Sequence, residues 1–138
     1  MSDIFISYSH ADRPMAESLA KDLESRGFKV WWDAELDGAD DYYEVILGAL
    51  QQAKAAIVIW TKLSTKSSFV RDEARFALHK KKLIAVREPG LDPMQIPFGF
   101  QCQHTDDVRN REHIVRSALK LGAWHPRLPN NRLQRANP

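Results

Sequence analysis

Short apolar runs alternate along this chain with helical stripes of apolar residues, and this alternation constrains the fold more than any other feature. The runs at residues 4–8, 28–33, 55–60 and 83–86 have the length of strands. The run at 55–60 is the most apolar, which is typical of a central strand covered on both faces. Between the runs, apolar residues recur at i, i+4 spacing within 15–23, 43–53 and 70–78. The pattern predicts an α/β protein with a parallel sheet and a helix in each connection.

Several residues mark where the helices begin and end. Asp12 is placed to cap the first helix, and Gly27 follows its end. The basic run 79–82 suits the negative end of the third helix dipole. A last helix is predicted at about 110–121, and a weak fifth strand within 98–104.

Five strands connected in this way predict a flavodoxin-like three-layer fold with helices on both faces of the sheet and strand order 2-1-3-4-5. In such a sheet, ligands bind beyond the carboxyl ends of strands one and three, where the winding direction reverses. This rule gathers around one crevice the polar and aromatic residues that end or follow the first three strands: Tyr8, Ser9, His10, Asp33, Trp60 and Thr61.

Length and composition limit the classes of function. The 138 residues predict one domain over 1–122, followed by a tail or linker at 123–138 that is rich in Pro, Asn and Arg. A net charge of +2 does not favour nucleic-acid binding, and the absence of a long apolar window predicts no membrane segment. The single cysteine, Cys102, cannot form an internal disulfide, which favours the cytoplasm, and is interpreted as a buried structural thiol.

An acidic loop at residues 33–41 matches the calcium loop of an EF-hand at most positions. We reject calcium there because the loop follows an aromatic strand instead of a helix, and because Asp40 stands where an apolar anchor is usual. The histidines show no i, i+4 pair and no HExxH motif, so no metal site is predicted. Ser7 and Ser9 lack a neighbouring glycine that would let the backbone wrap the phosphate of FMN.

Glu73 is the carboxylate with the most distinctive surroundings. Phe69 precedes it by four residues and Phe76 follows it by three, so on a helix the two rings lie beside the acid. Partial desolvation there would raise its affinity for protons and strengthen its attraction for a cation. The alternative is a solvent-exposed glutamate paired with Arg71 or Arg75. The periodicity leaves both interpretations open.

Several segments, taken together and in order, resemble a Toll/interleukin-1 receptor (TIR) domain over roughly residues 2–122. They are Asp3-Ile4-Phe5-Ile6-Ser7-Tyr8-Ser9, Gly27-Phe28-Lys29-Val30-Trp31-Trp32-Asp33, the loop Leu36-Asp37-Gly38-Ala39-Asp40, and the Ser-rich stretch from Ile59 through Ser64, Ser67 and Phe69 to Glu73. The loop matches the family's BB loop, and Glu73 matches its helix-borne glutamate.

The resemblance implies an enzyme that cleaves NAD+ at the bond between nicotinamide and ribose, with Glu73 as the catalytic residue. NAD+ is then a substrate, and no cofactor is expected. The implied substrate-binding residues are Tyr8, Ser9, Asp33, Trp60, Ser67 and Phe69. The BB loop, Leu36 to Asp40, implies association with other TIR domains.

Two other functions remain open at this point. Many TIR domains are non-catalytic modules that only assemble with other TIR domains, and these lack the glutamate. A nucleoside deoxyribosyltransferase has a related sheet and also uses a glutamate on ribose.

Overall fold

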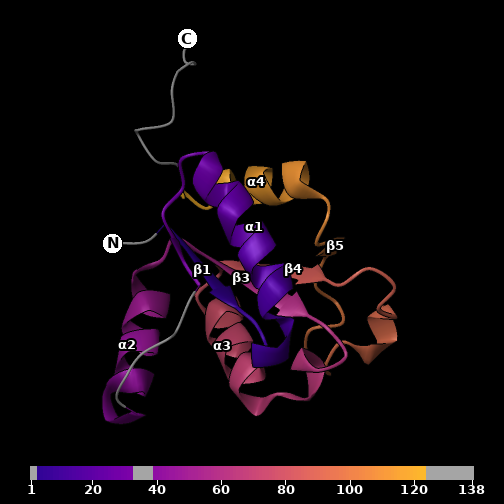
Figure 1. The fold of residues 1–138 in the computed structure, drawn as a ribbon. Helices are drawn as coiled ribbons and strands as arrows, with labels where there is room; N and C mark the ends of the chain where they lie inside the picture. Colours follow the sequence, from indigo (N-terminus) through magenta and orange to yellow (C-terminus); the bar gives the residue numbers. More distant parts are fainter. Residues whose placement is uncertain (1–2, 33–38, 124–138) are drawn as a thin grey trace.

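Five parallel strands form one sheet in the order β2-β1-β3-β4-β5, which confirms the predicted topology (Figure 1). The computed structural model describes residues 3–32 and 39–123. The strands are β1 (Ile4–Ser7), β2 (Val30–Trp31), β3 (Ala55–Trp60), β4 (Leu83–Arg87) and β5 (Thr105–Asp107). All four pairings are parallel, and the register of β1 with β3 places Ser7 opposite Val58.

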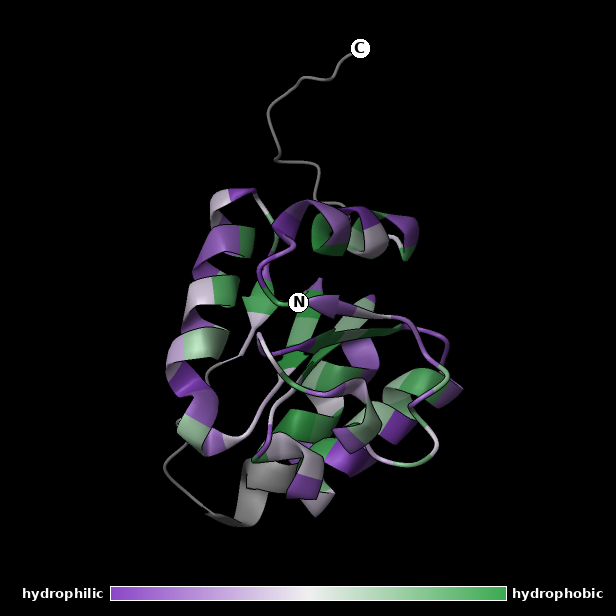
Figure 2. Ribbon diagram, turned by 90° about the vertical axis from the view of Figure 1, so that its right-hand side faces the viewer, coloured by the Kyte–Doolittle hydropathy of each residue, from purple (hydrophilic) through white to green (hydrophobic). Residues whose placement is uncertain are grey.

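Helices cover both faces of this sheet, as predicted. They are α1 (Arg13–Ser25), α2 (Ala39–Gln52), α3 (Ser68–His79) and α4 (Arg111–Lys120), joined by short 3-10 turns at His10–Asp12, Ser64–Lys66 and Pro93–Gln95. Buried residues of α1 and α4 pack with Ile4, Ile6, Ile57 and Ile59, and those of α2 and α3 pack with Phe5, Ala56 and Val58. In Figure 2, the side of α1 that faces the sheet is apolar and its outer side is polar.

Every residue of β3 is buried, with none more than 1% exposed. Because side chains alternate along a strand, one half of β3 enters each apolar layer. Each fully buried aliphatic side chain contributes about 1.5–3 kcal/mol relative to exposure. The central strand therefore joins the two halves of the core.

The edges of the sheet differ from expectation. Of the described residues of the predicted strand 28–33, Val30 and Trp31 form the strand, which lies at the edge of the sheet and pairs with β1. The fifth strand is Thr105–Asp107 and does not fall within 98–104, where backbone bonds from Phe100 to Pro97 and from Gln103 to Phe100 form turns. Cys102 is exposed in these turns, so its interpretation as a buried thiol is wrong.

Polar side chains fix the connection that leaves β3. Ser64 is buried, donates from Oγ to the carbonyl of Ile59 at 2.7 Å, and accepts from the backbone N–H of Thr61 at 2.8 Å. Thr61 Oγ1 donates to Asp12 Oδ2 at 2.6 Å. Asp12 occupies the N-cap position of α1 but makes no side-chain cap bond, because its carboxylate serves this cross-connection instead. The start of α1 is thereby attached to the end of β3.

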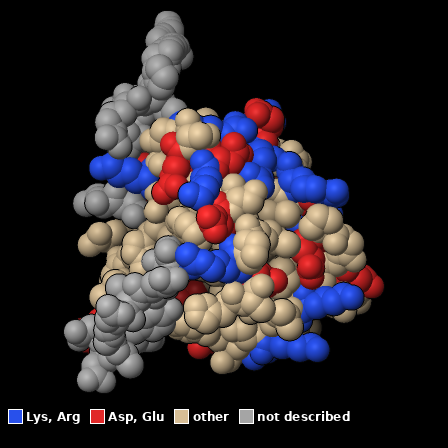
Figure 3. Space-filling model, viewed as in Figure 1, with Lys and Arg blue, Asp and Glu red and all other residues tan. Residues whose placement is uncertain are grey.

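Charged side chains of both signs lie on the surface of the molecule. On the face seen in Figure 3, basic and acidic side chains are interspersed. No helix within residues 3–32 and 39–123 has both the length and the apolar content needed to cross a membrane.

Lys82 closes the end of α2. Its Nζ donates to the carbonyls of Leu50 at 2.6 Å, Ala53 at 2.8 Å and Gln51 at 3.2 Å. These carbonyls belong to the last turn of α2 and the residue after it, where helical partners are missing. The basic run was expected to serve the third helix, but its last lysine serves the second.

We expect Lys82→Met to lower the free energy of unfolding by about 1–2 kcal/mol, because the variant keeps the aliphatic stem and loses the ammonium that binds these carbonyls. Lys80→Met is the matched control, because Lys80 and Lys82 lie at 5.8 and 5.7 Å from the Phe76 ring. Chemical denaturation of both variants measures the difference. Equal losses would show that the carbonyl contacts contribute nothing.

Candidate active site

A cavity of about 630 Å³ opens at the carboxyl end of β1. Its lining comes from β1 and the three residues after it, from the end of β2, from α2 and from the first half of α3. The lining residues are Phe5, Ile6, Ser7, Tyr8, Ser9, His10, Trp31, Trp32, Ile46, Ser67, Phe69, Val70 and Glu73. This is the sheet edge at which the topology predicts a ligand site.

Glu73 and Ser7 form the polar centre of the cavity. The Ser7 hydroxyl donates to Glu73 Oε1 at 2.5 Å, across 66 residues of sequence. Burial raises the pKa of Glu73 to about 7, the hydrogen bond from Ser7 opposes this shift, and the negative charge of Asp72 adds to it. Glu73 is therefore a largely desolvated carboxyl group, oriented by a short hydrogen bond from Ser7.

The alternative of an exposed, ion-paired glutamate does not hold. Arg75 pairs with Asp72 at 3.1 Å, and Glu73 forms no salt bridge with the residues that the structure describes. The helix thus directs two adjacent carboxylates to different environments. Asp72 points to solvent, and Glu73 points into the cavity.

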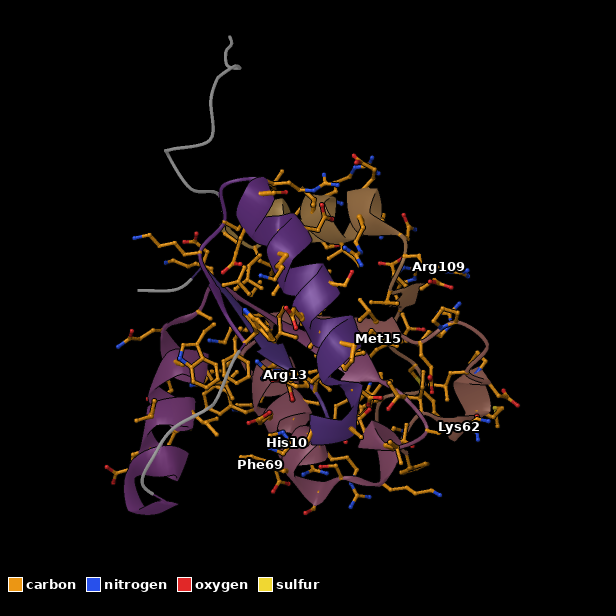
Figure 4. All side chains as sticks on the ribbon, in the orientation of Figure 1. His10, Arg13, Met15, Lys62, Phe69 and Arg109 are labelled. Atoms are coloured by element: carbon orange, nitrogen blue, oxygen red, sulfur yellow. The ribbon has the colours of Figure 1, made fainter. Side chains whose placement is uncertain are left out.

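Aromatic rings surround the polar centre. Trp31 stacks on Phe5 with ring centroids 5.1 Å apart and an interplanar angle of 4°. The Trp32 ring lies 5.1 Å from the guanidinium carbon of Arg13. Phe69 lines the cavity with 41% of its surface exposed, and Figure 4 shows it beside His10 below α1. Phe76, the other ring expected beside Glu73, packs into the apolar core under α2.

The structure brings together six of the residues singled out in the sequence: Tyr8, Ser9, His10, Ser67, Phe69 and Glu73. Ser67 also accepts from the backbone N–H of Val70 at 3.2 Å, so it caps α3, the helix that carries Glu73. Asp33, Leu36, Asp37 and Gly38 lie outside the described residues. Ala39 and Asp40 belong to the first turn of α2, so the expected loop 33–41 gives way to helix at Ala39.

Trp60 does not line the cavity. It is fully buried and contacts Phe100, with centroids 5.4 Å apart, because the segment after β4 covers the end of β3 with Leu91, Ile96 and Phe100. Its indole Nε1 has no hydrogen-bond partner within the described residues. Trp60, expected at the crevice among the substrate-binding residues, is therefore absent from the described lining of this cavity, which contains Trp31 and Trp32.

Ser7 also lines the cavity, although the sequence pointed to it only as a contact for the phosphate of FMN, an interpretation that we reject. Side chains alternate along a strand, so the sequence does predict that Phe5 and Ser7, two residues apart, share one face of β1. That face is the one covered by α2 and α3. The sequence did not show which helix lies opposite Ser7, because this depends on the order of the strands.

This arrangement suits the binding of a flat, positively charged group. A carboxylate in apolar surroundings attracts a cation more strongly than one in water, and aromatic faces bind rings and cations. Within the described lining, Glu73 and His10 are the side chains with metal-ligating atoms, so the cavity lacks the three or four ligands of a metal centre.

Comparison with known proteins agrees with this fold. A family model described as the TIR domain matches residues 4–116. Among solved structures, the metazoan TIR-STING receptor from C. gigas, in complex with 2',3'-cGAMP, has a TM-score of 0.70 and 25% identity, covering 86% of this chain and 39% of that one. The chain therefore spans well under half the length of that receptor.

Two further structures support the fold alone. The TIR domain of the Toll-related receptor TRR-2 from Hydra magnipapillata has a TM-score of 0.69 at 18% identity, covering 88% of this chain and 96% of that one. The TIR domains of the activated Roq1 resistosome, which recognises the pathogen effector XopQ, have a TM-score of 0.58 at 18% identity, covering 88% and 81%. No functionally curated protein matches the sequence.

The raised pKa of Glu73 makes stability depend on pH. The carboxyl group has an ordinary pKa of 4.5 and a pKa of about 7 in the folded chain, so the folded state holds this proton more tightly than the unfolded state. Its contribution to stability is complete below about pH 4.5 and is lost as the pH rises through 7.

We expect Glu73→Gln to stabilise the domain by up to about 3 kcal/mol near pH 8 and to have little effect near pH 4. Ser7→Ala removes the hydrogen bond that lowers the pKa of Glu73, so the pH range over which this stability is lost should move upward. Chemical denaturation across this pH range measures both effects. The same stability difference at both ends of the range would contradict the burial of the charge.

Proposed function

Because the chain belongs to the TIR domain family, we propose that it cleaves NAD+ at the bond between nicotinamide and ribose, with Glu73 as the catalytic carboxylate. The observation that carries the proposal is the position of Glu73, part-buried in the lining of the cavity and hydrogen-bonded there to Ser7. In this proposal the domain acts in the cytosol.

The chemistry needs one carboxylate. The nicotinamide of NAD+ is a pyridinium cation, so when its bond to C1' of the ribose breaks, the electron pair goes to the ring and nicotinamide leaves as a neutral molecule. Ordinary glycosidases need an acid to protonate the leaving group, and this reaction does not. The remaining requirement is to stabilise the positive charge that develops on the ribose.

Glu73 fits this requirement through its environment. The ionised carboxylate is poorly solvated, so it gains more from a nearby cation than an exposed carboxylate does. A bound pyridinium ring favours the ionised form and lowers the pKa of Glu73 from about 7. Water then adds to C1' and loses its proton, giving ADP-ribose, or a nitrogen of the adenine attacks and gives a cyclic product.

The rest of the cavity supports binding of the nicotinamide riboside half. Its volume of about 630 Å³ lies within the range of small-molecule sites. Trp32 and Phe69 offer aromatic faces, and the residues after β1, Tyr8 and Ser9, offer hydroxyls for the ribose. Ser7 acts as a positioning residue, because its hydrogen bond reaches the substrate only through Glu73.

We expect the purified domain to release nicotinamide from NAD+, and Glu73→Gln to reduce the rate roughly a hundredfold or more, about 2.7 kcal/mol in the barrier. Asp72→Asn is the matched control, since it removes the adjacent carboxylate, which points to solvent. Chromatography of the products measures the rate.

Three outcomes would overturn the proposal. Wild-type protein that leaves NAD+ intact while binding other TIR domains would identify a non-catalytic interaction module. Transfer of the sugar between deoxynucleosides would identify a deoxyribosyltransferase. An equally active Gln variant would show that Glu73 takes no part in the reaction.

We also propose that the domain associates with other TIR domains through the BB loop, Leu36 to Asp40, of which Leu36, Asp37 and Gly38 lie outside the described residues. The proposal rests on family membership and on the position of α2, which begins at Ala39 and contributes Ile46 to the cavity. An interface formed at the start of α2 is thus connected to the site through one helix.

If assembly completes the site, activity per molecule rises with protein concentration. Gly38→Val should suppress this rise, because a β-branched residue restricts the loop backbone. Activity measured over a dilution series, together with sedimentation of both proteins, tests this expectation. Specific activity that is independent of dilution would identify a self-sufficient monomeric site.

A further inference from the structure

A second group of ligating side chains lies at the other edge of the sheet. His104 precedes β5, Asp106 lies within it, and His113 lies in the first turn of α4. Asp106 Oδ1 is 3.0 Å from His104 Nε2, and Asp106 Oδ2 is 2.6 Å from His113 Nδ1. One ligand atom from each residue lies within 4.8 Å of the other two. Three strands separate β5 from β2, whose Trp31 lines the cavity.

The cluster has the composition and the spacing of an open metal centre. Two imidazole nitrogens and one carboxylate oxygen are the three protein ligands of one class of zinc site, with water in the fourth position. A tetrahedral ion with bonds of about 2.0–2.1 Å keeps its ligand atoms about 3.3 Å apart. The contacts of 3.0 and 2.6 Å are made by different oxygens of Asp106, so coordination of one ion needs the two imidazole rings to turn from these oxygens toward a common position.

The three residues of the cluster differ in their exposure to solvent. The Asp106 side chain is only 8% exposed, and both of its oxygens face imidazoles. His113 is 38% exposed and His104 is 71% exposed, so an ion can reach the cluster from solvent and retain a water ligand. The two rings meet edge to face, with centroids 5.3 Å apart.

Two of the neighbouring cations have acidic partners, and a third, Arg87, donates from Nη1 to the carbonyl and the hydroxyl of Thr105, each at 2.7 Å. Arg109 pairs with Asp107 at 2.8 Å, and Arg111 pairs with Asp22 at 3.2 Å. Figure 4 shows Arg109 on the side of the molecule away from His10 and Phe69, which line the NAD+ cavity of the proposed function.

We propose that His104, Asp106 and His113 bind one divalent transition-metal ion of the zinc type, which joins the edge strand β5 to α4. The ion coordinates the imidazole nitrogens that now contact the Asp106 carboxylate. It stabilises the folded chain, because the unfolded chain does not hold the three ligands together. The site is independent of Glu73.

Zinc titration of metal-free protein tests the proposal. All proteins carry Cys102→Ser, since Cys102 is an exposed thiol that competes for zinc. We expect one Zn²⁺ per chain by calorimetry, a higher melting temperature with Zn²⁺, and visible absorption bands of tetrahedral Co²⁺ when cobalt replaces zinc. His104→Gln and His113→Gln should each weaken binding roughly tenfold or more. His79→Gln, which changes an exposed histidine at the end of α3, should leave binding unchanged.

His104 is exposed, so its substitution does not disturb the core, and weaker binding in His104→Gln reports the loss of a ligand. A melting curve without metal verifies that the variant is folded. Absence of saturable Zn²⁺ binding would overturn the proposal and leave the cluster as a hydrogen-bonded network between β5 and α4. Binding of equal strength in His104→Gln would overturn it as well. Neither result bears on NAD+ cleavage, which is measured without added metal.

Discussion

The burial of β3 on both faces is the constraint on which the rest of the structure depends. A strand with every residue buried has no face or edge available to solvent, so it needs a strand on each side and a helical layer above and below. Because the neighbouring strands are parallel, their carboxyl ends meet along one edge of the sheet. Ser7 therefore reaches the level of the α3 turn that carries Glu73, and the cavity forms there.

Two polar arrangements at this edge have opposite consequences for stability. The network of Asp12, Thr61 and Ser64 satisfies its buried groups and fixes the connection after β3. Glu73, in contrast, is a part-buried acid that accepts from a hydroxyl and forms no salt bridge within residues 3–32 and 39–123, so its ionised form is disfavoured. A domain selected only for stability would place a neutral residue there. The reaction that we propose needs this charge to stabilise a developing cation, and the charge makes the domain less stable at high pH.

Different side chains meet at the two edges of the sheet, where the edge strands approach their neighbouring helices. At one edge, the aromatic residues that end β2 close a cavity around an acid from α3. At the other edge, β5 and α4 bring a carboxylate between two imidazoles. Similarity to solved TIR structures at 18–25% identity agrees with the sheet and its helices. The fold thus supplies positions, and the side chains at those positions supply the chemistry.

The sequence by itself determined the order and type of the elements, because hydrophobic periods of two and about 3.6 residues are local properties of a strand and a helix. It placed β3 at 55–60 and put a ring beside Glu73, since residues four apart on a helix are neighbours. Only the tertiary structure decided that Ser7 would bind Glu73, that Trp60 would be covered by a later segment, and that His104 would meet a histidine nine residues on. These contacts depend on which strands are adjacent and which helix covers them. Hydrophobic periodicity is a local property of the sequence and does not contain this information.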